Sequence, residues 1–383
     1  MSNAEIESIT KNLEISYADF QSEPSQKNKN NMLNSMLKIC QFYAQEGDYK
    51  SFEKIFISVR NLEGLTFSEE ISKLLAECFF KLTAAARNMI FQQPEILDGL
   101  FTLMIDLKMK TPCREYVCLY KSVHKFRKPW KGYLDFCRWW NMENFMDEDY
   151  VIEAGSKMSL AESALIFFTK RVINSSFDED FAKLALTFIR KKIKYNLSVY
   201  SNYYIAKLLL RLKFNNEQIR SVLRPFIKEK PLKPWGWHLM SKTFYVSNNF
   251  NEKYACLLLA LNVGKDFKEE ILNGIYLDLA LMFKDLNKFG NAKFFFEIYF
   301  RIKKKCKHKI PEFIIKIARE NWYQSVISER PNTSFDYKEV CREIYRQIRN
   351  IDSVMMDEVS QKLENDFHET IQWSSNWYET MEE

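Results

Sequence analysis

A repeated helical pattern places the strongest limit on what this chain can fold into. Apolar helical faces over 202–212, 237–250 and 276–289 each carry a small residue at the same point, namely Ala206, Ser241 and Ala280. These small residues lie 35 and 39 positions apart. A period of this length is typical of stacked helix pairs. The sequence therefore predicts an α-solenoid.

Composition favours the same architecture over the whole chain. The 383 residues include only 9 glycines and 9 prolines, against roughly 27 and 19 at average usage. Sheet-rich folds need many turns, and turns consume both residue types. Earlier segments show the same helical spacing of apolar residues. Examples are the faces Met36–Tyr43 and Tyr49–Val59 on either side of Gly47. We predict an all-α superhelix of antiparallel helix pairs.

One segment in particular resembles the tetratricopeptide repeat. Between Tyr276 and Tyr299, apolar and small residues stand where that family places its signature. The matching positions are Leu279, Ala280, Phe283, Phe289, Ala292 and Phe296. Two further segments, Met36–Phe56 and Trp237–Ala260, match less closely. The resemblance implies divergent helical repeats over 1–150, tetratricopeptide-like repeats over 151–330 and capping helices over 331–383.

A second segment is similar to the helical regions of bacterial conflict-system proteins. It runs from Phe136 to Phe145, FCRWWNMENF, and continues in Glu148, Asp149 and Tyr150. Those proteins join tetratricopeptide repeats to cold-shock or S1-type β-barrels, so the resemblance implies a defence-associated scaffold. The sequence itself contains no β-barrel pattern.

Motifs of common catalytic sites are missing from the sequence. It contains no GxxxxGK[ST], GxGxxG, HExxH, GxSxG or EF-hand pattern, and only four histidines. We therefore expect no enzymatic activity, no cofactor and no metal. The acidic runs 147–149 and 178–180 suit helix starts better than a metal site. Cys113 and Cys118 point about 140° apart on one helix, so they cannot readily share an ion.

The expected location is the cytoplasm. The start of the chain lacks the basic segment and apolar run of a secretory signal. No apolar stretch reaches the roughly 18 residues that a membrane span requires. The eight cysteines show no CxxC pair and fall mostly in apolar helical stretches, as expected of reduced thiols.

Three basic runs are candidate binding residues in the sequence. The net charge is +6 and the pI about 8.7. One run comprises Arg190, Lys191, Lys192 and Lys194, another Lys303, Lys304, Lys305 and Lys307. A third comprises Lys121, Lys125, Arg127, Lys128 and Lys131. Two interpretations are open for each run. The cations are favoured near helix C-termini by the helix dipole, or they line a groove that contacts phosphates. Likewise Trp235, Trp237 and Tyr245 fit either core packing or base stacking.

The expected function is protein–protein interaction on a helical-repeat concave surface. A nucleic-acid-associated module that binds phosphates through basic helix ends is the alternative, followed by a peptide-gated regulator. The sequence predicts a further helix over 352–383 that caps the last repeat. A protein or peptide partner is expected, nucleic acid is a possible partner, and a membrane is not. Partner identity and oligomeric state are left open.

Overall fold

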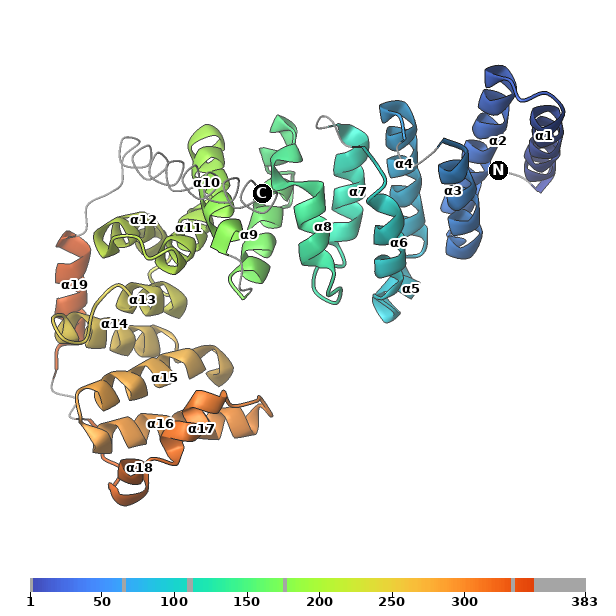
Figure 1. Ribbon diagram of the computed structural model, residues 1–383. Helices are drawn as coiled ribbons and strands as arrows, with labels where there is room; N and C mark the ends of the chain where they lie inside the picture. The colour runs from blue at the N-terminus through green and yellow to red at the C-terminus, as the bar shows by residue number, and fades with distance from the viewer. Residues whose placement is uncertain (1–2, 64–66, 109–112, 175–177, 332–334, 348–383) are drawn as a thin grey trace, which may run out of the picture. The chain divides into compact units, whose positions relative to one another are not determined.

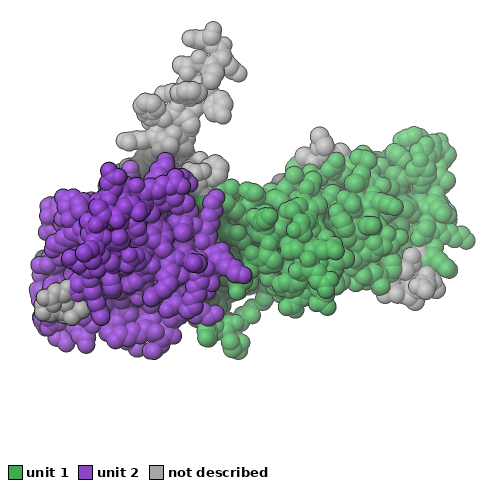
Figure 2. All heavy atoms as spheres, turned by 90° about the horizontal axis from the view of Figure 1, so that it is seen from below, with its two compact units in different colours: residues 1–174 green, residues 175–383 purple. Residues whose placement is uncertain are grey.

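The computed structural model describes residues 3–63, 67–108, 113–174, 178–331 and 335–347. Every regular element in these ranges is a helix, and none is a strand. The prediction of an all-α fold is therefore confirmed. The chain divides into two compact units, residues 1–174 (unit 1) and 175–383 (unit 2), which Figure 2 shows in different colours.

Unit 1 consists of helices that pack mainly against their neighbours in the chain (Figure 1). Its α-helices are α1 (Asn3–Ser22), α2 (Gln26–Glu46), α3 (Tyr49–Glu63), α4 (Glu69–Ala85), α5 (Arg87–Gln92), α6 (Ile96–Met104), α7 (Arg114–His124), α8 (Tyr133–Trp140) and α9 (Leu160–Val172). Two 3-10 turns, η1 (Met142–Asn144) and η2 (Asp147–Tyr150), join α8 to α9.

Local sequence signals set several of these helix ends. Gly47 ends α2 with φ 74°, a left-handed conformation that glycine adopts without a steric penalty. The Ser68 hydroxyl accepts from Ile71 N at 3.3 Å and so caps the first turn of α4. Gly47 thus lies at the break between the two apolar faces predicted from the sequence, 36–43 and 49–59.

The centre of unit 1 is unusually aromatic. The segment 136–150 supplies apolar side chains to this core, and Phe136, Cys137 and Trp140 are fully buried. Tyr120 and Tyr133 share a hydrogen bond of 2.5 Å between their hydroxyls, and the Trp140 indole donates to Tyr116 O at 3.3 Å. Buried polar tips need such partners. The aromatic residues of the segment that resembles conflict-system proteins therefore pack in the core.

Unit 2 is a regular series of helix pairs. Helix α10 (Asp178–Tyr195) comes first. The pairs are α11 (Val199–Arg211) with α12 (Asn216–Glu229), α13 (Pro234–Ser241) with α14 (Phe250–Val263), and α15 (Glu269–Asp285) with α16 (Phe289–Lys305). Each helix packs against the next one in the chain from α10 to α16. This is the predicted packing of neighbouring helix pairs.

The proposed repeat signature lies in the α15–α16 pair. Leu279, Ala280, Ala292 and Phe296 are fully buried, and Phe283 is 3% exposed. The two alanines lack bulk, which allows the helices to pack closely. Phe289 is half-buried, and its ring stacks on Trp322 at 4.8 Å between centroids.

After α16 the chain reverses and returns along the stack. Two short helices follow, α17 (Glu312–Ala318) and α18 (Asn321–Ser325), and residues 326–331 then run beside the start of α16. Glu329 N donates to Gly290 O at 3.0 Å, and Lys293 Nζ donates to Val326 O at 2.9 Å. These contacts direct the chain back towards α14.

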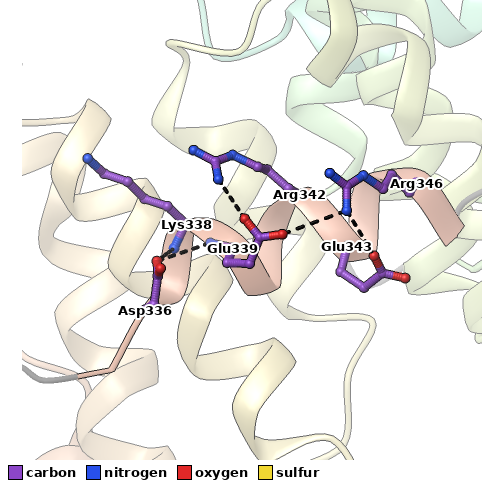
Figure 3. Close-up of polar contacts among 6 residues, drawn as sticks. All are labelled: Asp336, Lys338, Glu339, Arg342, Glu343 and Arg346. Atoms are coloured by element: carbon purple, nitrogen blue, oxygen red, sulfur yellow. Dashed lines mark hydrogen bonds and ion pairs between the residues drawn. The ribbon is translucent and has the colours of Figure 1, made fainter.

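Helix α19 (Tyr337–Gln347) packs against α14, five helices earlier in the chain. Cys341 and Ile344 are buried on its inner side. Figure 3 shows its polar side, where Glu339 bonds Arg342 at 2.5 Å and Asp336 accepts from the amides of Lys338 and Glu339 at 3.1 Å. A helix apolar on one side and charged on the other is typical of a surface helix.

Two sequence expectations stay predictions. The boundaries at 150 and 330 divide the chain by type of repeat, and the capping helix expected over 352–383 lies outside the described residues. Among the helices that are described, none has the length and apolar character needed to cross a membrane.

Candidate functional site

The first predicted basic run lies in the last turns of α10. Lys192 Nζ donates to Leu197 O at 2.8 Å, across the turn into α11. The ammonium groups of Lys191 and Lys194 lie 5.9 and 4.7 Å from the Tyr195 ring centroid. Arg190 is exposed on the same stretch. The run therefore stands at the turn between α10 and α11.

The second predicted run lies at the end of α16. Lys303, Lys304 and Lys305 form its last turn, and Lys307 follows with φ 54°. Lys305 Nζ pairs with Glu269 Oε2 at 2.8 Å. Lys303 Nζ lies 5.6 Å from the Tyr299 ring centroid. This run stands at the turn between α16 and α17.

Antiparallel pairing places these two turns on one edge of unit 2. Successive helices run in opposite directions, so the turns after α10, α12, α14 and α16 all fall on one side of the stack. The turns after α11, α13 and α15 fall on the other. The two runs are separated by three helix pairs along the stack, but they share its edge (Figure 1).

Contacts between neighbouring turns connect this edge. Lys230, in the α12–α13 turn, pairs with its neighbour Glu229 at 2.8 Å. Trp235 at the start of α13 meets Phe267 in the α14–α15 turn, with ring centroids 5.8 Å apart. The Lys305–Glu269 pair then joins the end of α16 to the start of α15. Contacts thus connect the turns after α12, α14 and α16.

Close packing at the α14–α15 turn depends on one glycine. A Cβ at Gly264 would collide with Leu272 Cδ2 and with Ala260 O, which is backbone. The ring of Pro234 in the preceding turn lies beside it, with its Cβ 3.4 Å from that position. Gly264 therefore allows two successive turns to approach each other.

Further cations lie between the two predicted runs. Lys228, Lys265 and Lys268 are exposed, and Lys230 and Lys233 are half-buried. Lys233 Nζ lies over both the Trp235 and Phe267 rings, at 5.5 and 5.3 Å. We call the whole set the basic edge. Its residues are Arg190, Lys191, Lys192, Lys194, Lys228, Lys230, Lys233, Lys265, Lys268, Lys303, Lys304, Lys305 and Lys307.

The charge distribution along the chain agrees with this location. Residues 175–347 contain 32 lysines and arginines against 18 aspartates and glutamates. Residues 348–383 contain 2 against 9. The overall charge of +6 hides this separation. Counting charge by segment is the signal that would have revealed the intermediate lysines from the sequence.

The three aromatic residues singled out in the sequence have different surroundings. Trp237 is 7% exposed, and its indole donates to Pro231 O at 3.0 Å, so it is part of the core. Trp235 is half-buried on the basic edge. Tyr245 is 67% exposed in the α13–α14 turn, on the opposite edge.

A second polar cluster links the first helices of two pairs. Asp278 of α15 bonds His238 Nε2 of α13 at 2.7 Å and pairs with Lys242 at 3.1 Å. Burial raises the pKa of the Asp278 carboxyl, but the bonds to His238 and Lys242 outweigh this effect. The pKa of Asp278 therefore lies below its ordinary value. The nearby Ser241 hydroxyl donates to His238 O instead of the ring. The cluster therefore provides a link between helices.

Side chains that could bind a metal lie apart from one another in the described part of the chain. Across the described ranges, no three His, Cys, Asp or Glu side chains lie close enough to hold an ion. Asp149 accepts from Met146 N at 2.8 Å at the start of η2, as an acid at a helix start does. All eight cysteines are free thiols, five of them buried.

Comparison with known protein families gives a match in unit 2. The sequence profile of a domain of unknown function (DUF7017) matches residues 199–341. The matched segment begins at the first residue of α11 and ends at Cys341, through which α19 packs in the core. It thus takes in the three helix pairs and the first part of α19, up to Cys341. No curated protein matches the chain.

Proposed function

We propose that this chain is a non-enzymatic helical-repeat protein of the cytoplasm, which binds a nucleic-acid strand along the basic edge. The observation that supports the proposal is the succession of cations along the basic edge. Four successive turns of unit 2 each bring cations to one side of the stack, and contacts join the last three of these turns. A line of cations along an elongated edge suits an elongated polyanion.

Helix polarity alone accounts poorly for this arrangement. Each helix end carries about half a negative charge, which favours one cation nearby. The last turn of α16 and the turn after it carry Lys303, Lys304, Lys305 and Lys307, and Lys305 alone among them forms an ion pair with a described carboxylate. Such an excess raises the local positive potential, which attracts a polyanion.

Aromatic side chains on the edge add a second kind of contact. Trp235 and Phe267 meet beside Lys233, so a ring and an ammonium group are available together. Bases of a single strand stack on such rings with little sequence preference. The proposed ligand is therefore single-stranded RNA or DNA, bound largely without regard to sequence.

The same proposal includes the type of repeat. The α15–α16 pair carries the tetratricopeptide signature, and we assign the pairs of unit 2 to that type. The segment Phe136–Tyr150 supports a place for the protein in a bacterial conflict system, where strand binding and assembly go together.

A protein-binding scaffold is the second candidate, and exposed apolar side chains favour it. Phe313 on α17 is 53% exposed, and Ile327 in the returning segment is 79% exposed. Exposed apolar groups of this size near the end of a repeat array favour docking of a protein partner.

Titration of the full chain against a labelled single strand tests the main proposal. We would follow fluorescence anisotropy with an oligonucleotide of about 20 nucleotides, RNA or DNA, over a series of salt concentrations. The logarithm of the affinity should fall linearly with the logarithm of salt, by about 0.7 per phosphate contact. Absence of binding at low salt would refute the proposal and leave the scaffold as the better candidate.

A further inference from the structure

Two cysteines lie opposite each other where α19 packs on α14. Cys256 of α14 is fully buried, and Cys341 of α19 is 2% exposed. Their side chains are close enough for a hydrogen bond between the two thiols. Both are free thiols in this structure. The packing of α19 therefore brings together two thiols that are far apart in the chain.

Ring contacts fix the position of α19 on both sides of this pair. Just before α19, the Phe335 ring stacks on the Tyr254 ring of α14, with centroids 5.5 Å apart. Near the end of α19, the Tyr345 ring lies 5.0 Å from Arg224 Cζ of α12. The helix is thus anchored at both ends, and the two thiols are held opposite each other between the anchors.

The geometry of packed helices suits a disulfide at such a position. Helix axes in contact lie about 8 to 10 Å apart, and Cα atoms lie about 2.3 Å from each axis. Facing Cα atoms are therefore separated by roughly 3.5 to 5.5 Å, which overlaps the range of about 4.4 to 6.8 Å that a disulfide spans. Cysteines that face each other across a helix contact can thus be joined without a large movement of either backbone.

The docked helix protects the thiols. Burial raises the pKa of the Cys256 thiol well above its ordinary value, and the hydrogen bond to Cys341 acts in the same direction. The buried thiol therefore stays protonated and unreactive, because the thiolate is the nucleophile. When α19 lifts from α14, both sulfurs meet water and this effect of burial is lost. Reaction with an oxidant is thereby coupled to the movement of α19.

The size and packing of α19 allow such a movement. The helix has 11 residues, of which Cys341 and Ile344 are buried. An isolated helix of this length is marginal in water. An element with few buried apolar contacts opens locally at a lower free energy than the rest of the fold. Opening of α19 therefore exposes the thiol pair while the helix pairs of unit 2 stay folded.

We propose that Cys256 and Cys341 form a redox-sensitive disulfide that locks α19 onto α14. While α19 is open, a peroxide oxidises one thiol to a sulfenic acid and is itself reduced to water. When α19 closes, the second thiol attacks this sulfur, the S–S bond forms and a second water leaves. Each sulfur loses one electron, and the peroxide accepts both.

This chemistry is compatible with a reducing compartment. Disulfides of cytosolic proteins are usually transient and serve redox sensing, and thiol–disulfide exchange returns the pair to its reduced form. The pair includes no residue of the basic edge, so the disulfide forms whether or not unit 2 binds a strand.

Peptide mapping of the oxidised full chain tests the bond itself. The protein is treated with hydrogen peroxide, alkylated and digested with trypsin without reduction. Mass spectrometry should detect fragments 254–265 and 339–342 joined by a disulfide, and dithiothreitol should separate them. Absence of the joined fragments would overturn the proposal.

A second pair of cysteines gives an internal control. Cys40 and Cys78 are also buried, on α2 and α4, which pack against each other inside unit 1. They should stay reduced under conditions that join Cys256 to Cys341. Equally fast oxidation of both pairs would mean that the thiols react through general unfolding, and it would overturn the coupling to α19.

Hydrogen exchange tests the lock. Exchange in α19 should become about tenfold slower or more in the oxidised chain, and it should recover after reduction. Cys341→Ala should abolish this response to peroxide, whereas Cys78→Ala should keep it. Equal exchange in the oxidised and reduced chains would overturn the lock.

Alkylation of the reduced chain tests the opening of α19. Ile344→Ala weakens the packing of α19, so the Cys341 thiol should react with iodoacetamide about tenfold faster or more. Glu343→Ala, on the charged side of the same helix, should leave the rate unchanged. Equal rates in the two variants would overturn the opening of α19 as the controlling step.

Discussion

Lys305 Nζ lies 2.8 Å from Glu269 Oε2 and joins the last turn of α16 to the first turn of α15. The bond to Lys305 lowers the pKa of the Glu269 carboxyl. Both groups are exposed, so the pair contributes little to stability. Its importance is positional, because it aligns two turns of the basic edge while Lys303, Lys304 and Lys307 stay without a described carboxylate partner.

Aromatic stacking on the basic edge leads to one prediction. Trp235→Leu removes the ring that meets Phe267, so affinity for a single strand should fall by about 1 to 3 kcal/mol. The salt dependence should stay unchanged, since no charge is lost. Tyr245→Leu, on the opposite edge, is the matched control. Anisotropy titrations that give both variants the same affinity would remove Trp235 from the site.

Close packing of α15 on α16 leads to a stability prediction. Ala280 is fully buried, and Ala280→Leu would force extra bulk into the pair at a cost of about 1 to 3 kcal/mol. The melting temperature should fall by several degrees. Ile271→Leu, at a position 46% exposed on the same helix, should stay within about 0.5 kcal/mol of the parent protein. Similar melting of both variants would show that the pair tolerates bulk.

Burial of His124 leads to a pH prediction. Its pKa is lowered to about 3, mainly by burial and also by Arg127. Below pH of about 6.5 the unfolded chain binds a proton that the folded chain does not. Stability should therefore decrease as pH falls from 7 to 5, by roughly 2 kcal/mol from this residue.

Urea unfolding at both pH values checks this contribution. His124→Gln should show a smaller decrease between pH 7 and 5 than the parent protein, because the titrating group is gone. An unchanged pH dependence in the variant would mean that the pKa of His124 is the same in the folded and unfolded chains, which contradicts the predicted effect of burial.

Packing of α19 leads to a fourth prediction. Ile344→Ala removes a buried side chain and should cost about 2 to 5 kcal/mol in the stability of the α14–α19 packing. Hydrogen exchange should then accelerate in α19 and along α14. Glu343→Ala, on the charged side in Figure 3, should leave exchange unchanged. Equal exchange in the two variants would contradict the assigned packing.

The sequence predicted the parts of the fold that depend on neighbouring residues. Apolar periodicity located α15 and α16, and Gly47 marked the break between two earlier helices. The packing of α19 on α14 could not be predicted from the sequence. The apolar side of α19, with Cys341 and Ile344, does not by itself specify which helix it packs against. Contacts between distant segments depend on tertiary packing that local pattern does not encode.

The candidate site was predicted only in part. The runs at Arg190–Lys194 and Lys303–Lys307 were identified, but their common edge required the direction of every helix between them. Lys228, Lys265 and Lys268 stand alone in the sequence and form no run.

A comparison of two triple variants tests the central claim most directly. One variant, Lys228→Gln/Lys265→Gln/Lys268→Gln, removes three charges from the basic edge. The other, Lys213→Gln/Lys288→Gln/Lys338→Gln, removes three exposed charges from outside it. The account predicts that the first variant binds a single strand more weakly and reduces the salt slope by about 2, while the second matches the parent protein. Equal affinities and equal slopes in the two variants would contradict it.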